Sequence, residues 1–392
     1  MPKSDTRKRI WIHAASVGEV MASEPVIKAY KELHPEDEIV MSVITPGGFE
    51  VAQKLKGKFL TEALYAPFDL PFAVKRFIEA IKPDELVILE TEIWPNLLYL
   101  TRSSGARICL INGRISDKSL PRYRRFKRFI RWSLTHFDRI LVQTETDLAR
   151  YMELGACQGS TQVAGNAKFD QISEPLNEER RRDLMCEFRL PPGAPVWVVG
   201  STRTPEEESC ILDAYTRLLK EIPDLVLIHA PRHIERSEEI ASSMRSRGLE
   251  PVMRTELKEI THPPTQIILN SFGELVNVYA LADVAFVGNS MLPPGGGQSP
   301  LQPLAQGTPT LFGPYMTNFR DIVAMMKSSE TGWEVRDAND LYSKAMNIIR
   351  DNELKTRIRV DGPALIRKNR GASQRYAQTM AELLNITNSA RQ

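Results

Sequence analysis

Short apolar runs alternate with amphipathic stretches along the whole chain, and no other feature constrains the fold as strongly. The runs in the first half are RIWIHAA, EIVMSVIT, ELVILETE, RICLING and RILVQTE, and those in the second half are PVWVVGST, DLVLIHAP, TQIILN, DVAFVGN and TPTLFG. Continuous apolar runs are typical of parallel strands that are buried on both faces. Stretches such as EPVIKAYKELHP and EESCILDAYTRLLKEI are typical of helices that cover a sheet. The pattern predicts an α/β fold with two parallel sheets.

The alternation lapses once, in the charged stretch SEPLNEERRRDLMCEFRLPPGAP, which ends in a Pro/Gly turn. Such a change of composition marks a boundary between domains. A chain of 392 residues with 42% hydrophobic content is also long enough for about two cores. We therefore predict a first Rossmann-like domain at 1–172, a linker at 173–194, a second Rossmann-like domain at 195–365 and a C-terminal helical segment at 366–392.

Composition excludes several classes of protein. The 51 basic and 49 acidic residues leave a formal net charge of +2, so the whole molecule has no strong field that would attract nucleic acid. The four cysteines lie far apart without a CxxC pair, which argues against a disulfide framework and a zinc site and favours a reducing cytoplasm. No signal-peptide core precedes the first apolar run, and no run reaches the roughly 18 to 20 residues needed to span a bilayer.

Polar or glycine-rich residues follow most of the predicted strands. Ligands of parallel α/β folds bind at the carboxyl edges of the sheets, so these residues are the candidate site. In the first half they occupy positions 16–19, 45–48, 90–96 and 112–114. In the second half they occupy positions 201–204, 231–233, 273–275 and 295–303.

The stretch WIHAASVGEV places a carboxylate, Glu19, where a helix begins after the first strand. An acid in the first turn complements the helix dipole, and many such acids act only as caps. A carboxylate at a ligand-binding edge is also suited to general base catalysis, because burial raises its basicity. The residues alone leave both interpretations open.

The strongest local signal is GNSMLPPGGGQSPLQPLAQG at residues 288–307. Three glycines followed by Pro300 and a helix predict free backbone N–H groups and a positive helix end aimed at an anion. The stretch matches neither a Walker A loop nor GxGxxG, so it favours neither ATP hydrolysis nor a dinucleotide cofactor. In GSTRTPEEE, Thr204 and Pro205 start a helix and leave Ser201, Thr202 and Arg203 facing the ligand edge.

With these loops in view, the sequence resembles the Kdo (3-deoxy-D-manno-octulosonic acid) transferase family. The matching stretches run in order from about residue 10 to about residue 325: WIHAASVGEV, YAPFDLP, ETEIWPNLL, NGRIS, LVQTETD, GNAKFD, GSTRTPEE, HAPRHIER, GELVNVYALADVAFVG and LFGPYMTNFRDI. The resemblance implies a GT-B fold with an acceptor-binding first domain and a CMP-sugar-binding second domain, whose C-terminal helix returns to the first. It implies inverting transfer of Kdo from CMP-Kdo to a lipid A precursor without a metal or other cofactor.

The resemblance also assigns roles to individual residues. Glu19 aligns with the proposed general base, and Glu92 with a second functional carboxylate, for which Glu90 is the less favoured choice. Ser16 and Gly18 belong to the acceptor side, whereas His13 and His233 are read as structural. The residues assigned to the donor are Lys168, Ser201, Thr202, Arg203, Arg232, Gly273, Glu274, Leu275, Gly296, Gly297, Gln298, Ser299 and Gln302.

The chain departs from the family pattern in the glycine-rich loop. Family members read close to GGHNPLEP where this chain reads GGQSPLQP, so Gln298, Ser299 and Gln302 replace His, Asn and Glu, and Asn270 stands where Asp is usual. A Gln at position 302 still accepts hydrogen bonds from ribose hydroxyls but loses their charge-assisted strength. Two alternatives follow: a divergent transferase with another nucleotide sugar or acceptor, and a non-catalytic binding protein with the same fold. An epimerase is less favoured, because the epimerases lack the ETEIWPN and GNAKFD context.

A basic and aromatic stretch, SLPRYRRFKRFIRWSLTHF at residues 119–137, has the spacing of an amphipathic helix. Such a helix suits anionic lipid, which would place the protein on the inner face of the cell membrane without a spanning segment. The family usually begins with an apolar anchor, and none precedes the first strand here. The alternative is an ordinary helix with its Phe and Trp face in the core. The cations assigned to the membrane are Arg122, Arg124, Arg125 and Arg128.

Overall fold

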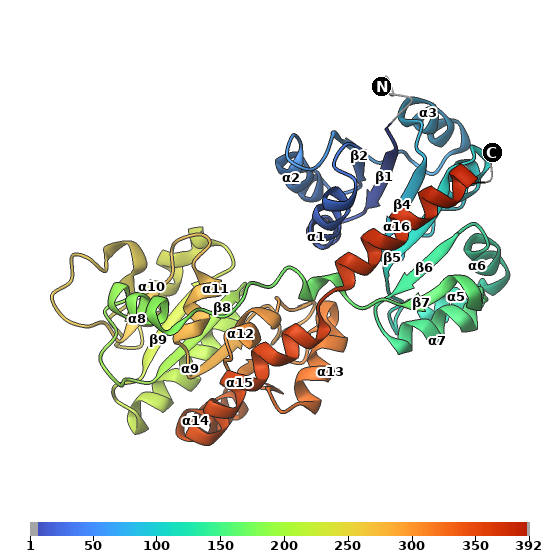
Figure 1. Cartoon of the computed structure of the whole chain (residues 1–392). Helices are drawn as coiled ribbons and strands as arrows, with labels where there is room; N and C mark the ends of the chain where they lie inside the picture. Colours follow the sequence, from blue (N-terminus) through green and yellow to red (C-terminus); the bar gives the residue numbers. More distant parts are fainter. Residues whose placement is uncertain (1–6, 390–392) are drawn as a thin grey trace. The chain divides into compact units, whose positions relative to one another are not determined.

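The apolar runs of each half form one sheet of parallel strands with helices on both faces (Figure 1). The computed structural model describes residues 7–389 and divides the chain into two units. Unit 1 comprises the described residues up to Gln171 together with those from Asn369 onward, and unit 2 comprises Ile172–Lys368. The α/β fold class predicted from the sequence is confirmed.

Unit 1 has a seven-stranded sheet with the order β3-β2-β1-β4-β5-β6-β7. Its strands are β1 (Arg9–Ala14), β2 (Glu38–Val43), β3 (Glu62–Tyr65), β4 (Glu85–Leu89), β5 (Arg107–Gly113), β6 (Arg139–Val142) and β7 (Thr161–Val163). Its helices are α1 (Val17–Leu33), α2 (Pro46–Leu55), α3 (Pro71–Ile81), α4 (Pro95–Ser103), α5 (Leu120–Arg125), α6 (Lys127–Leu134), α7 (Glu145–Leu154) and α16 (Ala372–Ser389).

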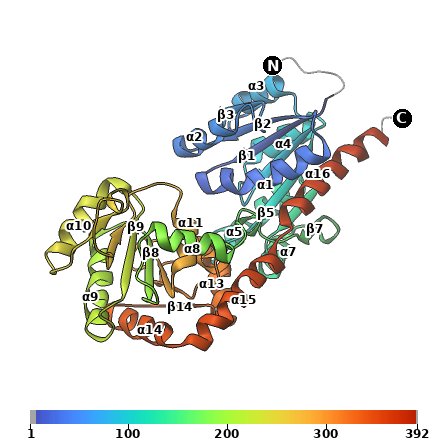
Figure 2. The same cartoon turned by 60° about the vertical axis from the view of Figure 1, so that its left-hand side comes forward.

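Two apolar layers hold this sheet. On one face, alternate strand residues such as Ile10 and Ile12 pack against α1, α2 and α16. On the other face, the intervening residues, such as Trp11, pack against α3, α4, α6 and α7. The terminal helix α16 lies beside α1 (Figure 2). The carboxylate of Asp170 fixes the start of α16, because it accepts the backbone N–H groups of Gly371 and Ser373 at 2.6 and 2.7 Å.

Unit 2 repeats the arrangement with the order β10-β11-β9-β8-β12-β13-β14. Its strands are β8 (Val196–Thr202), β9 (Val226–Pro231), β10 (Val252–Met253), β11 (Gln266–Ile268), β12 (Val284–Val287), β13 (Thr310–Phe312) and β14 (Gly332–Glu334). Its helices are α8 (Glu178–Glu187), α9 (Pro205–Glu221), α10 (Ser237–Arg245), α11 (Leu275–Val278), α12 (Leu301–Ala305), α13 (Arg320–Ser328) and α14 (Ala338–Arg350), followed by α15 (Asn352–Asn369).

Most of the segment 173–194, expected as a linker, is structured as part of unit 2. It contains α8, which is strongly polar but buries Leu184, and Phe188 at the end of α8 is also buried. Both side chains pack against the second sheet, in a cluster that includes Val198 and Ile228. Leu176, Met185, Leu190 and Ala194 of the same segment pack against this cluster as well. These apolar side chains dock the charged stretch, because fully burying a large one contributes about 1.5–3 kcal/mol.

Proline and hydroxyl residues explain where several helices begin. Thr45 and Thr204 are the N-caps of α2 and α9, and each is followed by a proline at the first helical position. The hydroxyl accepts a free backbone N–H, and proline fits there because its missing N–H would have no partner. These local signals hold the loops between strand and helix at the carboxyl edge of each sheet, where the candidate site residues lie. Among the described residues, no helix has the length and apolar character needed to cross a membrane.

Candidate active site

The strand order of unit 1 reverses direction between β1 and β4, which lie side by side in register from Ile10 and Glu85. The loops that follow these two strands therefore diverge to opposite sides and leave a crevice at the carboxyl edge, which is where ligands bind in open α/β sheets. Glu19 follows β1, and Glu90 and Glu92 follow β4. The topology thus brings the predicted catalytic carboxylates to one point of the fold.

Glu19 forms a reciprocal cap at the start of α1. Its carboxylate accepts the Ala15 backbone N–H at 2.7 Å and the Ser16 hydroxyl at 2.9 Å, while the Ser16 hydroxyl accepts the Glu19 backbone N–H at 3.4 Å. Burial raises the pKa of Glu19 to about 7, with smaller upward contributions from the nearby Glu90 and Glu92 and downward ones from these hydrogen bonds. A carboxylate has about four acceptor positions and this one uses two, so Glu19 can be both a cap and a base. Gly18 is exposed one position before it.

Cations and an indole surround the two carboxylates after β4. Lys168 Nζ and Arg114 Nε each lie 4.0 Å from a carboxylate oxygen of Glu90. Glu92 accepts a 2.7 Å hydrogen bond from Trp94 Nε1, and burial raises the pKa of Glu92. Glu90 itself has φ 55°, a left-handed conformation that is costly for a residue with a Cβ. Backbone strain of this kind gathers at functional sites. Trp94 and Arg114 lie in the candidate ranges 90–96 and 112–114, but the sequence analysis assigned neither of them an individual role.

A chain of side-chain amides positions Lys168. Gln143 donates to the backbone carbonyl of Asn112 at 2.9 Å, and Asn166 donates to Gln143 at the same distance. The side-chain Oδ1 atoms of Asn112 and Asn166 accept the backbone N–H groups of Ala167 and Lys168. All three side chains are buried, and their hydrogen bonds to one another and to the backbone rigidify the GNAKFD turn. The order of strands β5, β6 and β7 assembles this network from distant parts of the sequence.

Unit 2 has its own reversal of strand order, between β8 and β12. The residues at these strand ends include Ser201 (φ 63°) and Asn289 (φ 57°), which are again left-handed. The buried carboxylate of Glu207, in the first turn of α9, accepts the backbone N–H groups of Asn289, Ser290 and Met291 at 2.8, 2.9 and 3.1 Å. Glu207 therefore ties the loop after β12 to the loop after β8.

The residues around Ser201 divide into interior and surface positions. Contrary to expectation, Thr202 is fully buried, and its hydroxyl bonds to Glu208 at 3.0 Å and His229 at 2.9 Å. Arg203 and Arg232 are exposed at the same edge, and the Arg232 backbone N–H donates to the Thr202 carbonyl at 2.8 Å. Within the part of the chain that the structure describes, neither guanidinium group has a hydrogen bond or ion pair. The guanidinium groups of Arg203 and Arg232 are therefore available to bind an anion.

The glycine-rich loop differs from the expected anion cradle. The backbone N–H groups of Gly296 and Gly297 donate to the carbonyls of Tyr315 and Asn289 at 2.8 and 2.9 Å, so neither is available to a ligand. A Cβ at Gly297 would lie 2.2 Å from Met316 Sδ, which explains the glycine by packing. The helix that follows, α12, is only five residues long and starts at Pro300. The sequence could not show that neighbouring strand ends would occupy these donors.

The remaining donor residues lie in unit 2 as follows. Gln298, Ser299 and Gln302 are partly buried in the loop and the first turn of α12. Gly273 has φ 85° and is exposed, and Arg254 at 2.9 Å and Ser271 hold the carboxylate of Glu274. Leu275 starts α11 and approaches β8, since one of its methyl carbons lies 3.2 Å from the position a Cβ would take on Gly200.

The basic stretch forms two short helices, α5 and α6, which are interrupted at Phe126. Phe126, Phe129 and Trp132 are about half exposed, with 56, 47 and 43% of their surface accessible, so the aromatic residues do not face the core as an ordinary amphipathic helix would require. Ile130 and Leu134 dock α6 instead. The four predicted cations Arg122, Arg124, Arg125 and Arg128 are all exposed, and Arg124 pairs with Glu153 at 2.6 Å.

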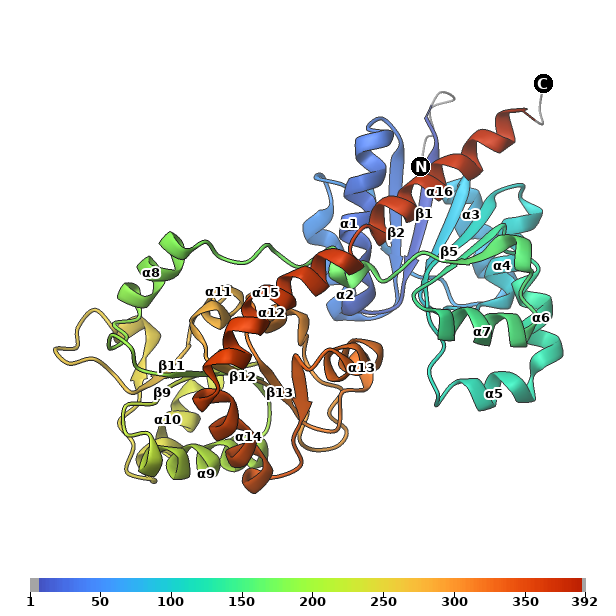
Figure 3. The same cartoon turned by 60° about the horizontal axis from the view of Figure 1, so that its bottom comes forward.

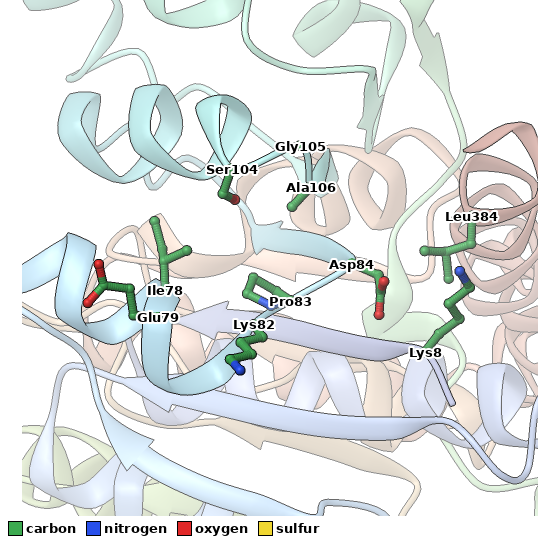
Figure 4. A pocket seen from close by; sticks show the side chains of 10 residues that line it. All are labelled: Lys8, Ile78, Glu79, Lys82, Pro83, Asp84, Ser104, Gly105, Ala106 and Leu384. Carbon is green, nitrogen blue, oxygen red and sulfur yellow. The ribbon is translucent and has the colours of Figure 1, made fainter. Parts of the chain in front are cut away.

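Two cavities of unit 1 lie at opposite edges of its sheet. One, of about 440 Å³, lies at the amino edge and is lined by charged side chains of both signs, including Lys8, Glu79 and Lys82 (Figure 4). It contains none of the predicted site residues. The other, of about 390 Å³, lies at the carboxyl edge and includes His13 and Trp94 in its lining. Among the described residues, no group of three or more His, Cys, Asp or Glu side chains could hold a metal ion.

Comparison with known proteins identifies the family of the chain. Residues 1–171 match the family model for 3-deoxy-D-manno-octulosonic-acid transferase (kdotransferase). The chain is 32% identical to the transferase of that name from Haemophilus influenzae over 96% of this chain and 87% of the relative. It is 32% identical to the one from Chlamydophila psittaci over 82% of this chain and 73% of the relative.

The solved structures extend the likeness to the fold of the whole chain. A glycosyltransferase from Rickettsia africae superposes with a TM-score of 0.63 at 13% identity, over 97% of this chain and 98% of that one. At this identity the likeness shows the fold, which is GT-B, and says nothing about the activity. The family is shown by the sequence relatives. Their identity and coverage show that this chain belongs to the 3-deoxy-D-manno-octulosonic acid transferase family of glycosyltransferases.

Proposed function

We propose that the chain transfers Kdo from CMP-Kdo to a hydroxyl group of a lipid A precursor, with inversion and without a metal ion. The acceptor oxygen attacks the anomeric carbon of Kdo, the bond from that carbon to the CMP phosphate oxygen breaks, and CMP leaves with the electron pair. The acceptor hydroxyl loses its proton to a base of the enzyme. One displacement inverts the anomeric centre and needs one base together with cations for the leaving phosphate.

The observation that carries this proposal is the position of Glu19 at the reversal point of the first sheet. The carboxylate is only 7% exposed, and burial raises its pKa to about 7. A base whose pKa lies near the working pH combines a useful ionised fraction with sufficient proton affinity. Glu19 is therefore assigned as the general base. Glu92, held by Trp94, is assigned to orient the acceptor together with Ser16 and Gly18.

The anionic groups of the donor are assigned to cations. Arg232 and Arg203 are exposed at the ligand edge of unit 2, and a guanidinium binds phosphate by two parallel hydrogen bonds. As charge grows on the leaving phosphate, these bonds strengthen. Lys168 is assigned to an anionic group of the donor sugar, with its direction set by the amide network of Asn112, Gln143 and Asn166.

Nucleotide binding tests the donor. We expect titration calorimetry to show binding of CMP in preference to UDP and ADP, because the family's donor is a cytidine nucleotide. Arg232→Ala should weaken CMP binding about tenfold or more, since a charge-assisted hydrogen bond contributes about 1.5–3 kcal/mol. Gln302→Glu should tighten it several-fold by restoring a charged acceptor for the ribose hydroxyls.

The same titration separates the alternatives. Arg245→Ala, an exposed arginine on α10 away from the ligand edge, is the matched control and should leave CMP binding unchanged. A preference for UDP would indicate a divergent transferase with another donor. Absence of binding to every nucleotide would refute the proposed donor and leave a non-catalytic protein with the family fold.

We further propose that the surface of α5 and α6 docks on anionic lipid at the inner face of the cell membrane. Its exposed cations would bind the head groups, and its half-exposed Phe126, Phe129 and Trp132 suit the interfacial layer. Trp132 also contacts Tyr99 of α4, at 6.3 Å between ring centroids, which extends the aromatic surface beyond α6. An acceptor with acyl chains requires such a position, because its sugars lie at the membrane surface.

Neutralising this surface should release the protein from vesicles. We expect glutamine at the four predicted arginines to weaken binding to anionic vesicles more than 100-fold, because each cation near an anionic surface contributes about 1 kcal/mol. Binding is measured by co-sedimentation, and an equal charge change on unit 2 serves as the control. The control replaces Lys220, Arg245, Arg336 and Arg350, which are exposed. Equal loss in both variants would refute a specific docking surface.

A further inference from the structure

The cavity at the carboxyl edge of unit 1 is mostly apolar. It has a volume of about 390 Å³ and lies between the ends of β1 to β3 and the starts of α3 and α4. Its lining is formed by His13, Ile44, Tyr65, Ala66, Pro67, Phe68, Asp69, Val74, Trp94 and Leu97. The one carboxylate in it, Asp69, is occupied in capping α4, where it accepts the backbone N–H groups of Asn96 and Leu97 at 3.1 and 2.8 Å.

His13, one of the lining residues, has a ring nitrogen without a hydrogen-bond partner among the described residues. The ring is 2% exposed, burial lowers its pKa to about 4, and its Nδ1 lies 2.9 Å from the Ser42 hydroxyl. That hydroxyl already accepts Trp11 Nε1–H at 2.8 Å. Its own proton is satisfied if it donates to Nδ1, which leaves a neutral imidazole with the hydrogen on Nε2. Nε2 is buried and has no partner among the described residues, so a residue of the cavity wall retains a donor suited to a neutral carbonyl oxygen.

The mouth of the cavity is rimmed by exposed apolar side chains. Phe68 is 84% exposed, and Tyr65 and Ile44 are 51 and 41% exposed. Large apolar groups left in water around a pocket mark a site for an apolar ligand. A polar or anionic ligand would find no cation in this lining and would leave its own groups without partners.

The cavity shares Trp94 with the candidate active site and adjoins α3 and α4, which pack on the same face of the sheet as α6. Trp94 lines the cavity and donates to the carboxylate of Glu92. The helices α3, α4 and α6 lie side by side on this face of the sheet (Figure 3). Phe72 on α3, Tyr99 on α4 and Trp132 on α6 are all exposed along it. An acyl chain that leaves a bilayer on this face would reach the cavity beside Glu92.

We propose that this cavity binds one acyl chain of the glycolipid acceptor, with the carbonyl oxygen of its ester or amide link accepting the Nε2 hydrogen of His13. The inference rests on the proposed function for the identity of the acceptor. It assigns His13 a ligand-binding role where the sequence predicts a structural one. The bound acyl chain fixes the position of the acceptor sugar relative to Glu19. Changes in the cavity should therefore affect transfer to acylated acceptors alone.

Substitutions that fill the cavity test this proposal through their effect on kcat/KM for Kdo transfer. Val74 is a fully buried residue of the lining, and Val74→Phe places a ring where the acyl chain would lie. Ile44→Phe is a second variant, at a partly exposed position of the lining. With an acylated acceptor we expect kcat/KM to fall at least tenfold, since each methylene denied burial costs about fourfold in affinity. With the deacylated, water-soluble acceptor we expect less than a twofold change. Leu33→Phe, at an exposed position of α1, is the control. Equal losses with both acceptors would overturn the proposal.

A binding measurement separates this inference from the proposed function. A nitroxide-labelled fatty acyl methyl ester should quench the fluorescence of Trp94, and the quenching should disappear in Trp94→Phe and weaken at least tenfold in Val74→Phe. The ether analogue of the same length should bind about two- to tenfold more weakly than the ester, and His13→Phe should abolish that difference. No quenching, or an ester preference that survives in His13→Phe, would overturn the assignment. If quenching occurs but no acceptor is glycosylated, the proposed function fails and the acyl site stands.

Discussion

Replacing Glu19 by Gln is expected to lower kcat/KM by about 10²–10⁴ while leaving the fold intact. General base catalysis by a positioned side chain contributes a factor of this size. The amide retains an oxygen that can accept the Ala15 N–H or the Ser16 hydroxyl, and Gln serves at this position of a helix cap as Glu does. Loss of activity without loss of stability would therefore separate the base from the cap.

Asp147 provides the matched control. It forms the same reciprocal cap with Thr144 at the start of α7, with its carboxylate accepting the Thr144 hydroxyl at 2.7 Å and its backbone N–H donating to that hydroxyl at 3.1 Å. It lies after β6, away from the reversal point of the sheet. Asp147→Asn should change thermal stability about as much as Glu19→Gln and change kcat/KM far less.

The pH dependence of the wild type gives a second test of Glu19. The base must be ionised, and its pKa is raised to about 7, so kcat/KM should fall about tenfold per pH unit below pH 7. This acidic limb should be absent in Glu19→Gln, whose residual activity does not depend on that ionisation. A limb that persists unchanged in the variant would assign it to another group and refute Glu19 as the base.

Replacing Glu207 by Ala is expected to destabilise unit 2 by about 2–6 kcal/mol. The change leaves the buried N–H groups of Ser290 and Met291 without an acceptor, and each such group costs about 1–3 kcal/mol. It also frees the loop after β12 from α9. CMP binding, as proposed for this edge, should therefore weaken along with the hydrogen-exchange protection of unit 2.

Glu206 is the control for this prediction, since it occupies the same first turn of α9 but is exposed. Glu206→Ala removes an equal charge from the helix start, where an exposed acid contributes about 0.3–1 kcal/mol. Unfolding in urea, followed by hydrogen exchange of unit 2 peptides, measures both variants. If the two lose similar stability, the loop does not depend on the Glu207 carboxylate.

The fold was predictable because its signals are local. A run such as ELVILETE is apolar on both faces over four consecutive residues, Leu86 to Leu89, as a buried parallel strand requires. The caps Thr45 and Thr204 with their following prolines likewise act within one turn. The short helix break at Phe126 and the docking of α8 were not predictable, because they depend on which side chains the rest of the unit leaves uncovered.

The candidate site divides along the same line. The sequence by itself determined that carboxylates and cations follow the strands, since Glu19, Glu92 and Arg232 each stand one turn or less beyond an apolar run. Only the tertiary structure decided which of their neighbours are available. The Gly296 and Gly297 N–H groups are occupied, the Thr202 hydroxyl points inward, and His13 Nε2 has no partner among the residues that the structure describes. Strand order pairs groups far apart in the chain, and no local pattern encodes which donor meets which acceptor.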